Sequence, residues 1–316
     1  MNAAVVRAFD APPSYSTFPD PVAQDGEHLV TVTAAGLHQI VKSLASGAHY
    51  GSTGELPFIP GVDGVGRLAD GRRIYFGGSR APYGTMAEIA LAPAWMTVPL
   101  PDGLDDATAA GIANPAMSSL VALTARAGFV AGESVLILGA TGVAGQLAIQ
   151  VARQLGAKRI VGAGRNVDAL CDAGLDEVIA LNQPEDDLRK AFIAEAVAGI
   201  DVVIDYLWSR PTELLLEALA KGFKATATHR TRLVEVGASA GPNITLPAAI
   251  LRSIDLTILG SGFGAASIDR IFAAVSELFA LAASGALKLD VDPVPLSDVE
   301  AAWTRADKGR RIVLTV

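Results

Sequence analysis

Apolar and polar positions follow two different rhythms along the chain. Up to about Pro101, short apolar runs are separated by glycine- and proline-containing turns, which is typical of strands in a mostly-β domain. An alanine-rich stretch over Asp105–Arg126 predicts a helix. From Ser134 onward, strand-like runs alternate with helical segments, as in a doubly wound parallel sheet. The elements predicted there are the helices Glu185–Ala198 and Thr212–Ala220 and the strands Ile200–Asp205, Arg232–Gly237 and Leu256–Gly260.

The end of the chain returns to the β rhythm. A helical segment over Ile268–Ser284 precedes two short runs, LDVDPVPL and RRIVLTV, which suggests that the C-terminus completes the first domain. The pattern therefore predicts an α/β protein with two domains. A Rossmann doubly wound parallel sheet is expected over residues 121–262, and a mostly-β domain over residues 1–120 that residues 263–316 complete.

The stretch Ser134–Arg165 contains a strand, a glycine-rich turn, a helix and a second strand. This βαβ unit is the one that holds a dinucleotide pyrophosphate at a helix N-terminus. Gly142 lets the backbone approach the phosphates, Gly145 lets the helix pack on the strand, and the first N–H groups of the helix face the anion. The predicted cofactor-binding residues of the turn are Gly139, Ala140, Thr141, Gly142, Val143, Ala144 and Gly145. A glycine turn without a ligand is the alternative.

The end of the second strand distinguishes NADPH from NADH. An NAD site usually has an acidic residue there, which accepts a hydrogen bond from the ribose 2′-OH. The segment Gly162–Asn166 has no acid; Arg165 offers a fork suited to a phosphate and Asn166 a neutral donor. We therefore expect NADP as the cofactor. The alternative is a solvated Arg165 and an Asn166 that only caps the following helix.

Three further loops are expected at the carboxyl ends of the strands, where ligands of such sheets bind. They contribute Tyr206, the triplet Gly237, Ala238 and Ser239, and the triplet Gly260, Ser261 and Gly262. The alternative is that these glycines only form turns and that the aromatic side chain packs in the core.

Composition argues against several other classes of protein. A net charge of −8 and a pI near 5.0, without a basic block, argue against a nucleic-acid partner. Although 51% of the residues are hydrophobic, each long apolar stretch is interrupted, so no membrane span is expected. The N-terminus has no signal region and reads as a short strand before a proline-rich loop. The single cysteine, Cys171, suits the cytoplasm and is expected to be a packing residue.

Seven segments, taken in order, resemble the medium-chain dehydrogenase/reductase superfamily, most closely its zinc-free quinone oxidoreductase (zeta-crystallin-like) subgroup. They are MNAAVVRAF, AAGLHQIVKSLASG, PGVDGVGRLADGRRIYF, GTMAEIALAP, LILGATGVAG, DVVIDYLW and VPLSDVEAAWTRADKGRRIVLTV. The resemblance spans essentially the whole chain and implies a GroES-like first domain beside the Rossmann domain. It also implies a homodimer, since relatives pair the strands equivalent to the apolar Leu256–Leu259 across a two-fold axis, which removes an exposed sheet edge.

The ligands of a catalytic zinc are missing from the expected positions. Such a site needs three ligands among Cys, His, Asp and Glu, with a fourth position open. Zinc-dependent alcohol dehydrogenases carry a cysteine after the AAG-like turn and a His-Glu pair after the PG turn. This chain has Leu37-His38 and Val62-Asp63 there and no cysteine cluster. His38, His49 and Asp63 are conceivable ligands that lack motif spacing, and we expect no metal.

Without a metal, hydride transfer suits substrates whose developing anion is delocalised. Quinones and α,β-unsaturated carbonyl compounds have this property. The resemblance implies three candidate catalytic residues: His38, where relatives commonly have asparagine; Tyr50, which matches a pocket tyrosine; and Ser118, where relatives often have threonine. Each has an ordinary alternative as a surface or packing residue. Val41 replaces an acid found in many relatives.

The expected function is therefore zinc-independent, NADPH-dependent reduction of a small molecule, either a quinone or an α,β-unsaturated carbonyl compound. Two alternatives stay open. One is an NADPH-binding protein or sensor without significant turnover, which the unusual His38 and Val41 would fit. The other is an alcohol dehydrogenase without zinc, for which the sequence offers no evident proton relay.

Overall fold

The computed structural model describes residues 1–222, 229–262, 264, 266–306 and 309–316. Contacts divide the chain into two compact units: unit 1 is Met1–Pro115 with Val275–Val316, and unit 2 is Ala116–Ala274. The domain boundaries expected at 120/121 and 262/263 stay a prediction. Residues 263, 265, 307 and 308 of the expected C-terminal segment lie outside the described residues.

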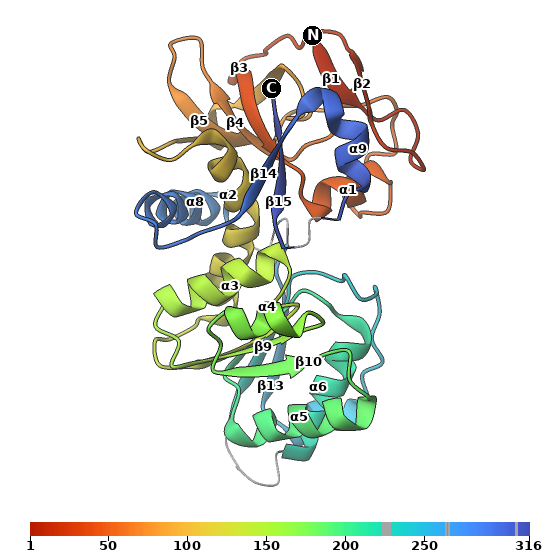
Figure 1. Ribbon diagram of the computed structural model, residues 1–316, viewed down its shortest axis with the longest axis vertical. Helices are drawn as coiled ribbons and strands as arrows, with labels where there is room; N and C mark the ends of the chain where they lie inside the picture. The colour runs from red at the N-terminus through yellow and green to blue at the C-terminus, as the bar shows by residue number, and fades with distance from the viewer. Residues whose placement is uncertain (223–228, 263, 265, 307–308) are drawn as a thin grey trace. The chain divides into compact units, whose positions relative to one another are not determined.

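Unit 2 is built on a six-stranded parallel sheet with the order β10-β9-β8-β11-β12-β13. Its strands β9, β10 and β13 are labelled in Figure 1. Its strands are β8 (Ser134–Leu138), β9 (Arg159–Gly164), β10 (Glu177–Ala180), β11 (Val202–Asp205), β12 (Thr231–Glu235) and β13 (Leu256–Gly260). The chain starts in the middle at β8, runs outward to β10 and crosses back to β11. The direction of winding therefore changes between β8 and β11, which is where such folds bind ligands. The doubly wound sheet expected from the sequence is confirmed.

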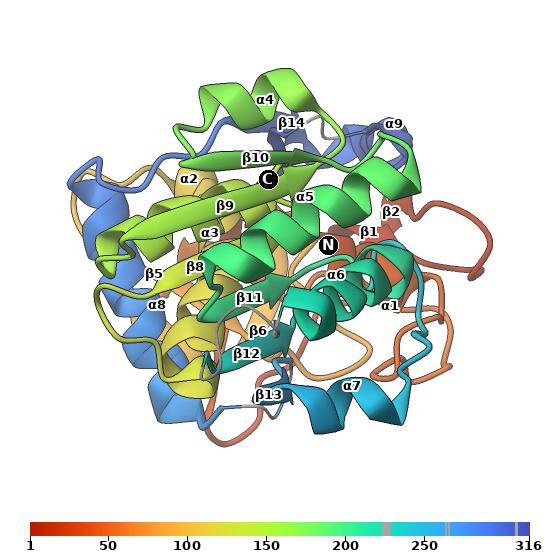
Figure 2. The same cartoon turned by 90° about the horizontal axis from the view of Figure 1, so that it is seen from below.

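The helices of unit 2 pack on both faces of this sheet. They are α3 (Val143–Gln154), α4 (Val167–Asp172), α5 (Glu185–Ala198), α6 (Ser209–Gly222) and α7 (Ala248–Ser253). In Figure 2, α5 and α6 lie in front of the sheet and α3 lies behind it. Side chains such as Leu136 and Val203 form a buried apolar core with residues of α5 and α6. Successive residues of a strand point to opposite faces of the sheet. Because helices cover both faces, the strands need apolar residues at nearly every position.

The helix expected over Asp105–Arg126 changes its winding near its end. It is α-helical only in α2 (Asp106–Val121), and η2 (Ala122–Ala127) is a π-helix. Within η2 the Thr124 hydroxyl donates to the carbonyl oxygen of Leu120 at 2.7 Å, four residues earlier. Such a side-chain bond competes with the backbone hydrogen bond and disturbs regular winding. The expected helical stretch is therefore present, and its last six residues are wound as a π-helix.

Unit 1 has a seven-stranded sheet with the order β14-β15-β3-β4-β5-β7, in which β6 also pairs with β3, and a small β1-β2 sheet. The strands are β1 (Asn2–Val5), β2 (Ser14–Thr17), β3 (Glu27–Gly36), β4 (Asp63–Arg67), β5 (Arg73–Gly77), β6 (Ile89–Pro93), β7 (Thr97–Pro99), β14 (Val291–Pro295) and β15 (Arg311–Thr315). The last strand, β15, runs antiparallel to β3. The expected mostly-β domain is thus confirmed.

Four short helical elements lie in the described part of unit 1, and a helix of 16 residues crosses the boundary between the two units at Ala274 and Val275. The remaining helical elements are α1 (Gln39–Ala45), η1 (Ala94–Met96), α8 (Ile268–Ala283), η4 (Leu296–Asp298) and α9 (Val299–Thr304). The proline-rich loop expected near the N-terminus contains β2, which pairs with β1 in antiparallel register. A four-residue strand with half-exposed side chains has too little apolar alternation to be read from sequence.

Candidate cofactor and active site

The turn between β8 and α3 presents a helix N-terminus that no side chain of the described residues caps. Gly139 follows β8 with a φ of +90°, which a glycine adopts without strain. Gly142 is the N-cap residue of α3 and no side chain caps this helix. The N–H groups of Val143, Ala144 and Gly145 belong to the first turn, where helix geometry supplies no acceptor. Together with the positive end of the helix dipole, they form a site for an anion.

The two glycines of the motif differ in what surrounds them. A Cβ on Gly145 would overlap the carbonyl oxygen of Gly139 and lie 2.6 Å from the Cα of Ala140, so packing alone requires glycine there. A Cβ on Gly142 would meet only the carbonyl oxygen of Gly139, at an ordinary 3.4 Å. No neighbour in the described chain therefore requires glycine at position 142. A pyrophosphate lying against the turn would require it, so the turn fits a dinucleotide.

The end of β9 carries the two residues expected to select NADPH. Arg165 is exposed and makes no hydrogen bond or ion pair with any residue that the structure describes. Asn166 caps α4, and its side-chain oxygen accepts a hydrogen bond from the N–H of Ala169 at 3.2 Å. The amide NH₂ of Asn166 is left for other partners. A Cβ on Gly164 would lie 2.9 Å from the Thr141 side chain, so this strand end and the β8–α3 turn are neighbours.

Tyr206 connects several predicted cofactor segments at the carboxyl edge of the sheet. Its N–H donates to the carbonyl oxygen of Leu138 at 3.1 Å, and a Cβ on Gly139 would lie 3.3 Å from its Cβ. Its carbonyl oxygen accepts from the N–H and the hydroxyl of Ser239, at 3.2 and 2.8 Å. The structure thus brings together the β8–α3 turn, Tyr206 and the triplet Gly237–Ser239.

The phenol of Tyr206 also meets a candidate catalytic residue. The hydroxyls of Tyr206 and Ser118 are 3.2 Å apart, within hydrogen-bond distance. Burial raises the pKa of Tyr206 to about 12, although hydrogen bonds with Ser118 and Ser119 oppose the shift. The phenol therefore stays protonated near neutral pH and can act as a hydrogen-bond donor. The pair joins α2 to the end of β11.

The triplet Gly260–Gly262 begins at the last residue of β13, two strands away from β11. The N–H of Ser261 donates to the carbonyl oxygen of Glu235 at 2.8 Å, and the Arg126 side chain donates to the carbonyl oxygen of Gly260 at 2.7 Å. These contacts hold the triplet on the edge strand. Its role in cofactor binding stays a prediction.

The other two candidate catalytic residues, His38 and Tyr50, belong to unit 1. Tyr50 is 77% exposed on the loop after α1, and its ring centroid lies 4.1 Å from that of His49. Burial lowers the pKa of His49, because desolvation disfavours the imidazolium. His38 is instead buried, with only 2% of its surface exposed. The two candidates therefore occupy different environments.

His38 lies beside Asp63, and Asp63 in turn binds Tyr75, a residue that could not be found from the sequence. His38 Nε2 lies 3.1 Å from Asp63 Oδ1, and the Tyr75 hydroxyl donates to Asp63 Oδ2 at 2.7 Å. Burial, and then the charge of Asp63, raise the pKa of Tyr75 well above its ordinary range. Two conceivable zinc ligands, His38 and Asp63, are thus adjacent. Among the described residues, no three His, Cys, Asp or Glu side chains are grouped as a metal site.

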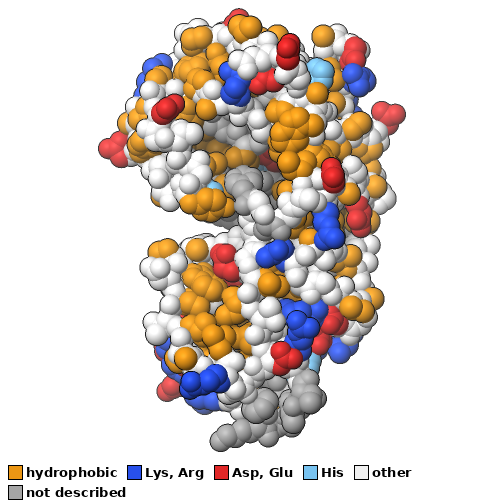
Figure 3. All heavy atoms as spheres, turned by 180° about the vertical axis from the view of Figure 1, so that it is seen from behind, with side chains coloured by type: hydrophobic (Ala, Val, Ile, Leu, Met, Phe, Trp, Pro, Cys, Tyr) orange, Lys and Arg blue, Asp and Glu red, His pale blue; other side chains and the backbone are white. Residues whose placement is uncertain are grey.

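Other sequence expectations concern the surface. Cys171 is exposed on α4, so its expected role as a packing residue is wrong; the short helix turns this position away from Leu170, which is buried. On the face drawn in Figure 3, basic and acidic side chains are interspersed. In the part of the chain that is described, no helix has the length and apolar character needed to cross a membrane.

Comparisons with known proteins agree with the fold. No family model matches the chain. The chain is 27% identical to a protein of Emericella nidulans named "Probable NADPH-dependent quinone reductase", over 99% of both chains. It is 30% identical to the quinone oxidoreductase of Homo sapiens over 68% of each chain.

A solved structure shows the same architecture. The quinone oxidoreductase of Thermus thermophilus, described with its NADPH complex, is 28% identical and superposes over the whole of both chains with a TM-score of 0.78. Units 2 and 1 correspond to the Rossmann and GroES-like domains of this superfamily. The chain therefore belongs to the quinone oxidoreductase family of the medium-chain dehydrogenase/reductases.

Proposed function

We propose that the protein is an NADPH-dependent reductase of quinones or α,β-unsaturated carbonyl compounds that works without zinc. The observation that carries this proposal is the β8–α3 turn: among the described residues no side chain caps α3, and a Cβ on Gly142 would meet only the carbonyl oxygen of Gly139, at an ordinary 3.4 Å. Arg165 lies at the end of the neighbouring strand with its guanidinium available. Relatives named for NADPH-dependent quinone reduction support the same function.

The chain's own residues would bind the cofactor and stabilise charge. The first N–H groups of α3 would hold the pyrophosphate and Arg165 the 2′-phosphate. NADPH supplies a hydride when it is bound. Donors such as the hydroxyls of Ser118 and Tyr206 would then stabilise the negative charge that develops on the substrate oxygen. A delocalised quinone or enone anion needs less of this stabilisation than an alkoxide, which is why no metal is invoked.

We further infer a cytoplasmic homodimer. β13 is one of the two edge strands of the unit 2 sheet, and its residues Leu256–Leu259 are only half-buried. An apolar edge strand tends to pair with another chain unless it is protected. The lone cysteine suits a reducing compartment. Sedimentation at micromolar concentration should give the mass of a dimer, and a monomer would contradict the inference.

A substrate panel tests the proposed activity. NADPH absorbance should fall when quinones or enals are added and should change little with simple ketones. With NADP⁺ and alcohols, little NADPH should form. A chelator should leave the rate of quinone reduction unchanged. NADPH binding without turnover on any member would favour the binding-protein alternative. Chelator-sensitive oxidation of alcohols would favour an alcohol dehydrogenase.

A further inference from the structure

A carboxylate is buried at the carboxyl end of β11, inside unit 2. Asp205 is the last residue of this strand and is fully buried. Its Oδ1 accepts the backbone N–H groups of Leu207 at 2.8 Å and Trp208 at 2.9 Å, and its Oδ2 accepts the Thr212 hydroxyl at 2.5 Å. Burial raises the pKa of Asp205, and these hydrogen bonds oppose the shift. Burying a carboxylate is costly, so its three bonds call for an explanation.

The segment that Asp205 binds has a strained backbone. Trp208 and Ser209 have φ angles of +56° and +58°, and no other non-glycine residue that the structure describes has a positive φ. A left-handed backbone crowds the Cβ of such residues and persists only where neighbouring contacts hold it. Asp205 binds the N–H groups of Leu207 and Trp208 on one side of the strained pair and the hydroxyl of Thr212 on the other. The carboxylate therefore holds both ends of the strained turn.

Residues 206–209 pack directly on the start of the cofactor turn. A Cβ on Gly139 would lie 3.2 Å from Leu207 Cδ2 and 3.3 Å from Tyr206 Cβ. The carbonyl oxygen of Leu207 also accepts the N–H of Ala240 at 2.8 Å, so the segment lies between the β8–α3 turn and the loop that follows β12. If the strained turn relaxed, Leu207 would move and Gly139 would lose the side chain that packs against it.

We propose that Asp205 is a positioning residue of the cofactor site, which holds residues 206–209 in their left-handed turn and thereby fixes the β8–α3 turn in the form that binds NADPH. This inference rests on the proposed function, in which that turn holds the pyrophosphate. The carboxylate acts through Leu207 and needs no contact with the cofactor. A variant that keeps an acceptor oxygen at position 205 should therefore keep NADPH binding, whereas a variant without one should lose it.

Substitutions at position 205 test this role by calorimetric titration with NADPH. Asp205→Leu, of similar size but without an acceptor, should raise the Kd by about ten-fold or more. Asp205→Asn keeps an oxygen for the two backbone N–H groups, and its amide can donate to the Thr212 hydroxyl, so its Kd should stay within about three-fold of the parent.

The control is the aspartate at the other end of the same strand. Asp201 directly precedes β11, and its carboxylate accepts the N–H of Ser134 at 2.7 Å and the hydroxyl of Ser134 at 2.9 Å. Asp201→Leu should lower the melting temperature and leave the Kd for NADPH unchanged. A parental Kd in Asp205→Leu, or equal losses in Asp205→Asn and Asp205→Leu, would overturn the positioning role.

A milder pair of variants keeps the test decisive even if Asp205→Leu does not fold. Thr212→Val removes only the hydroxyl that binds Asp205 and should raise the Kd for NADPH by about three-fold. The matched control is Thr231→Val, because the buried Thr231 hydroxyl donates to the carbonyl oxygen of Ile200 at 2.8 Å at the amino end of β12. A parental Kd in Thr212→Val, or equal losses in both threonine variants, would overturn the proposal. These titrations measure binding alone, so a protein that binds NADPH but reduces no quinone would contradict the proposed function and still give these results.

Discussion

Gly142 and Gly145 stand three residues apart in one turn, but different neighbours determine them. Gly145 is surrounded by the backbone of Gly139 and Ala140, whereas a Cβ on Gly142 would make only an ordinary 3.4 Å contact with the carbonyl oxygen of Gly139. At Gly142 the backbone has φ −73° and ψ 162°, which alanine also adopts. A methyl group at position 142 is therefore compatible with the fold and incompatible only with a ligand that lies against the turn.

This contrast predicts opposite outcomes for two alanine variants. Gly142→Ala should lower the free energy of unfolding by roughly 1 kcal/mol or less, the cost of alanine at an N-cap, so its melting temperature should stay close to that of the parent. The same variant should weaken NADPH binding by at least about ten-fold. Gly145→Ala should instead lower the melting temperature strongly, since the backbone must shift. Thermal unfolding and cofactor titration measure both effects. Parental NADPH affinity in Gly142→Ala would mean that the pyrophosphate does not lie on this turn.

Arg165 should determine the preference for NADPH. A charge-assisted hydrogen bond to phosphate contributes on the order of 1.5–3 kcal/mol, which is roughly ten- to a hundred-fold in affinity. Arg165→Ala should weaken NADPH binding by about that factor and leave NADH nearly unchanged. Titration of both cofactors measures the difference. The control is Arg7→Ala, an exposed arginine of unit 1 that contacts Ser16.

Position 165 should also tolerate an acidic residue in place of arginine. Arg165→Asp would repel the 2′-phosphate and offer an acceptor to a ribose 2′-OH, so the preference should move toward NADH. Ala163 is fully buried and a Cβ on Gly164 would crowd Thr141, so neither can carry the acid without disturbing β9. If Arg165→Ala weakened both cofactors equally, or neither, Arg165 would be a solvated side chain.

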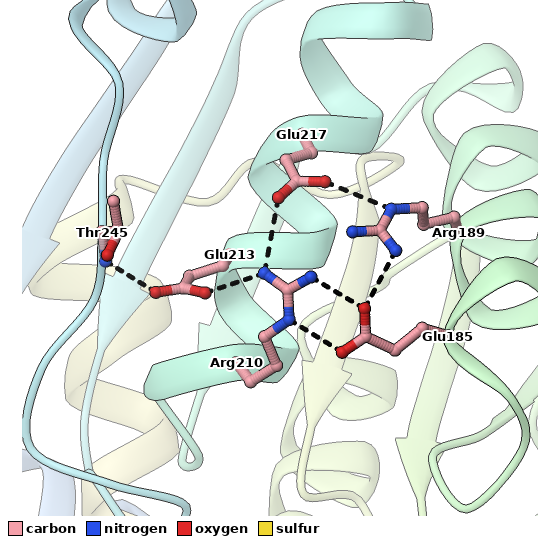
Figure 4. Close-up of polar contacts among 6 residues, drawn as sticks. All are labelled: Glu185, Arg189, Arg210, Glu213, Glu217 and Thr245. Carbon is pink, nitrogen blue, oxygen red and sulfur yellow. Dashed lines mark hydrogen bonds and ion pairs between the residues drawn. The ribbon is translucent and has the colours of Figure 1, made fainter.

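Between elements, an ion-pair network joins α5 and α6 (Figure 4). Arg210 binds Glu185 at 2.8 Å and Glu213 at 2.9 Å, and Arg189 binds Glu185 at 3.0 Å and Glu217 at 3.3 Å. Glu213 also accepts from the N–H of Thr245 at 2.6 Å, which ties the loop before α7 to α6. Isolated surface pairs contribute little, but several charges sharing partners contribute more.

The network should make the free energy of unfolding depend on pH in the acid range. Hydrogen bonds from Arg210 and Arg189 lower the pKa of Glu185 from 4.5 to about 2. A group whose pKa is lowered by folding stabilises the protein above its unfolded pKa, and this contribution is lost as the pH falls from 4.5 toward 2. Glu185→Gln should therefore lower the urea midpoint at neutral pH, and by less at about pH 3.

A second variant on α5 is the control for this prediction. Asp187 pairs only with the exposed Lys190 among the described residues, at 2.9 Å. Asp187→Asn should change the urea midpoint less than Glu185→Gln does at neutral pH. If the two variants lowered the urea midpoint equally, or if the effect of Glu185→Gln did not shrink at about pH 3, the shared ion-pair partners of Glu185 would contribute nothing to stability.

The elements with strong periodicity were predictable from sequence, and the short ones were not. The helix α5 and the strand β13 have the predicted bounds, because apolar alternation and flanking turn residues define both. The short helices α1, α7 and α9 have too few turns for an apolar stripe. The π-helical winding of η2, where the Thr124 hydroxyl also bonds the carbonyl oxygen of Leu120, is not revealed by helix propensity.

For the whole molecule, predictability depends on how far apart in sequence the parts of a site lie. The cofactor turn is contained in one βαβ unit, so its residues could be named in advance. Tyr206 and Ser239 could be placed at the same edge because parallel strands end together. The contact of Tyr75 with Asp63 depends on the register of β4 and β5, and the position of His38 beside them depends on tertiary packing. Neither has a local sequence signal.

The most direct test is the rate of NADPH oxidation by a quinone with protein from which metals have been removed. The parent should consume one NADPH per hydroquinone formed, at a rate that added zinc does not change, and should be slower with NADH at the same subsaturating concentration. Gly142→Ala should lose most of this rate at the same NADPH concentration while it remains folded. Activity that appears only after zinc is restored, or NADPH binding without any hydroquinone formation, would contradict a zinc-independent reductase.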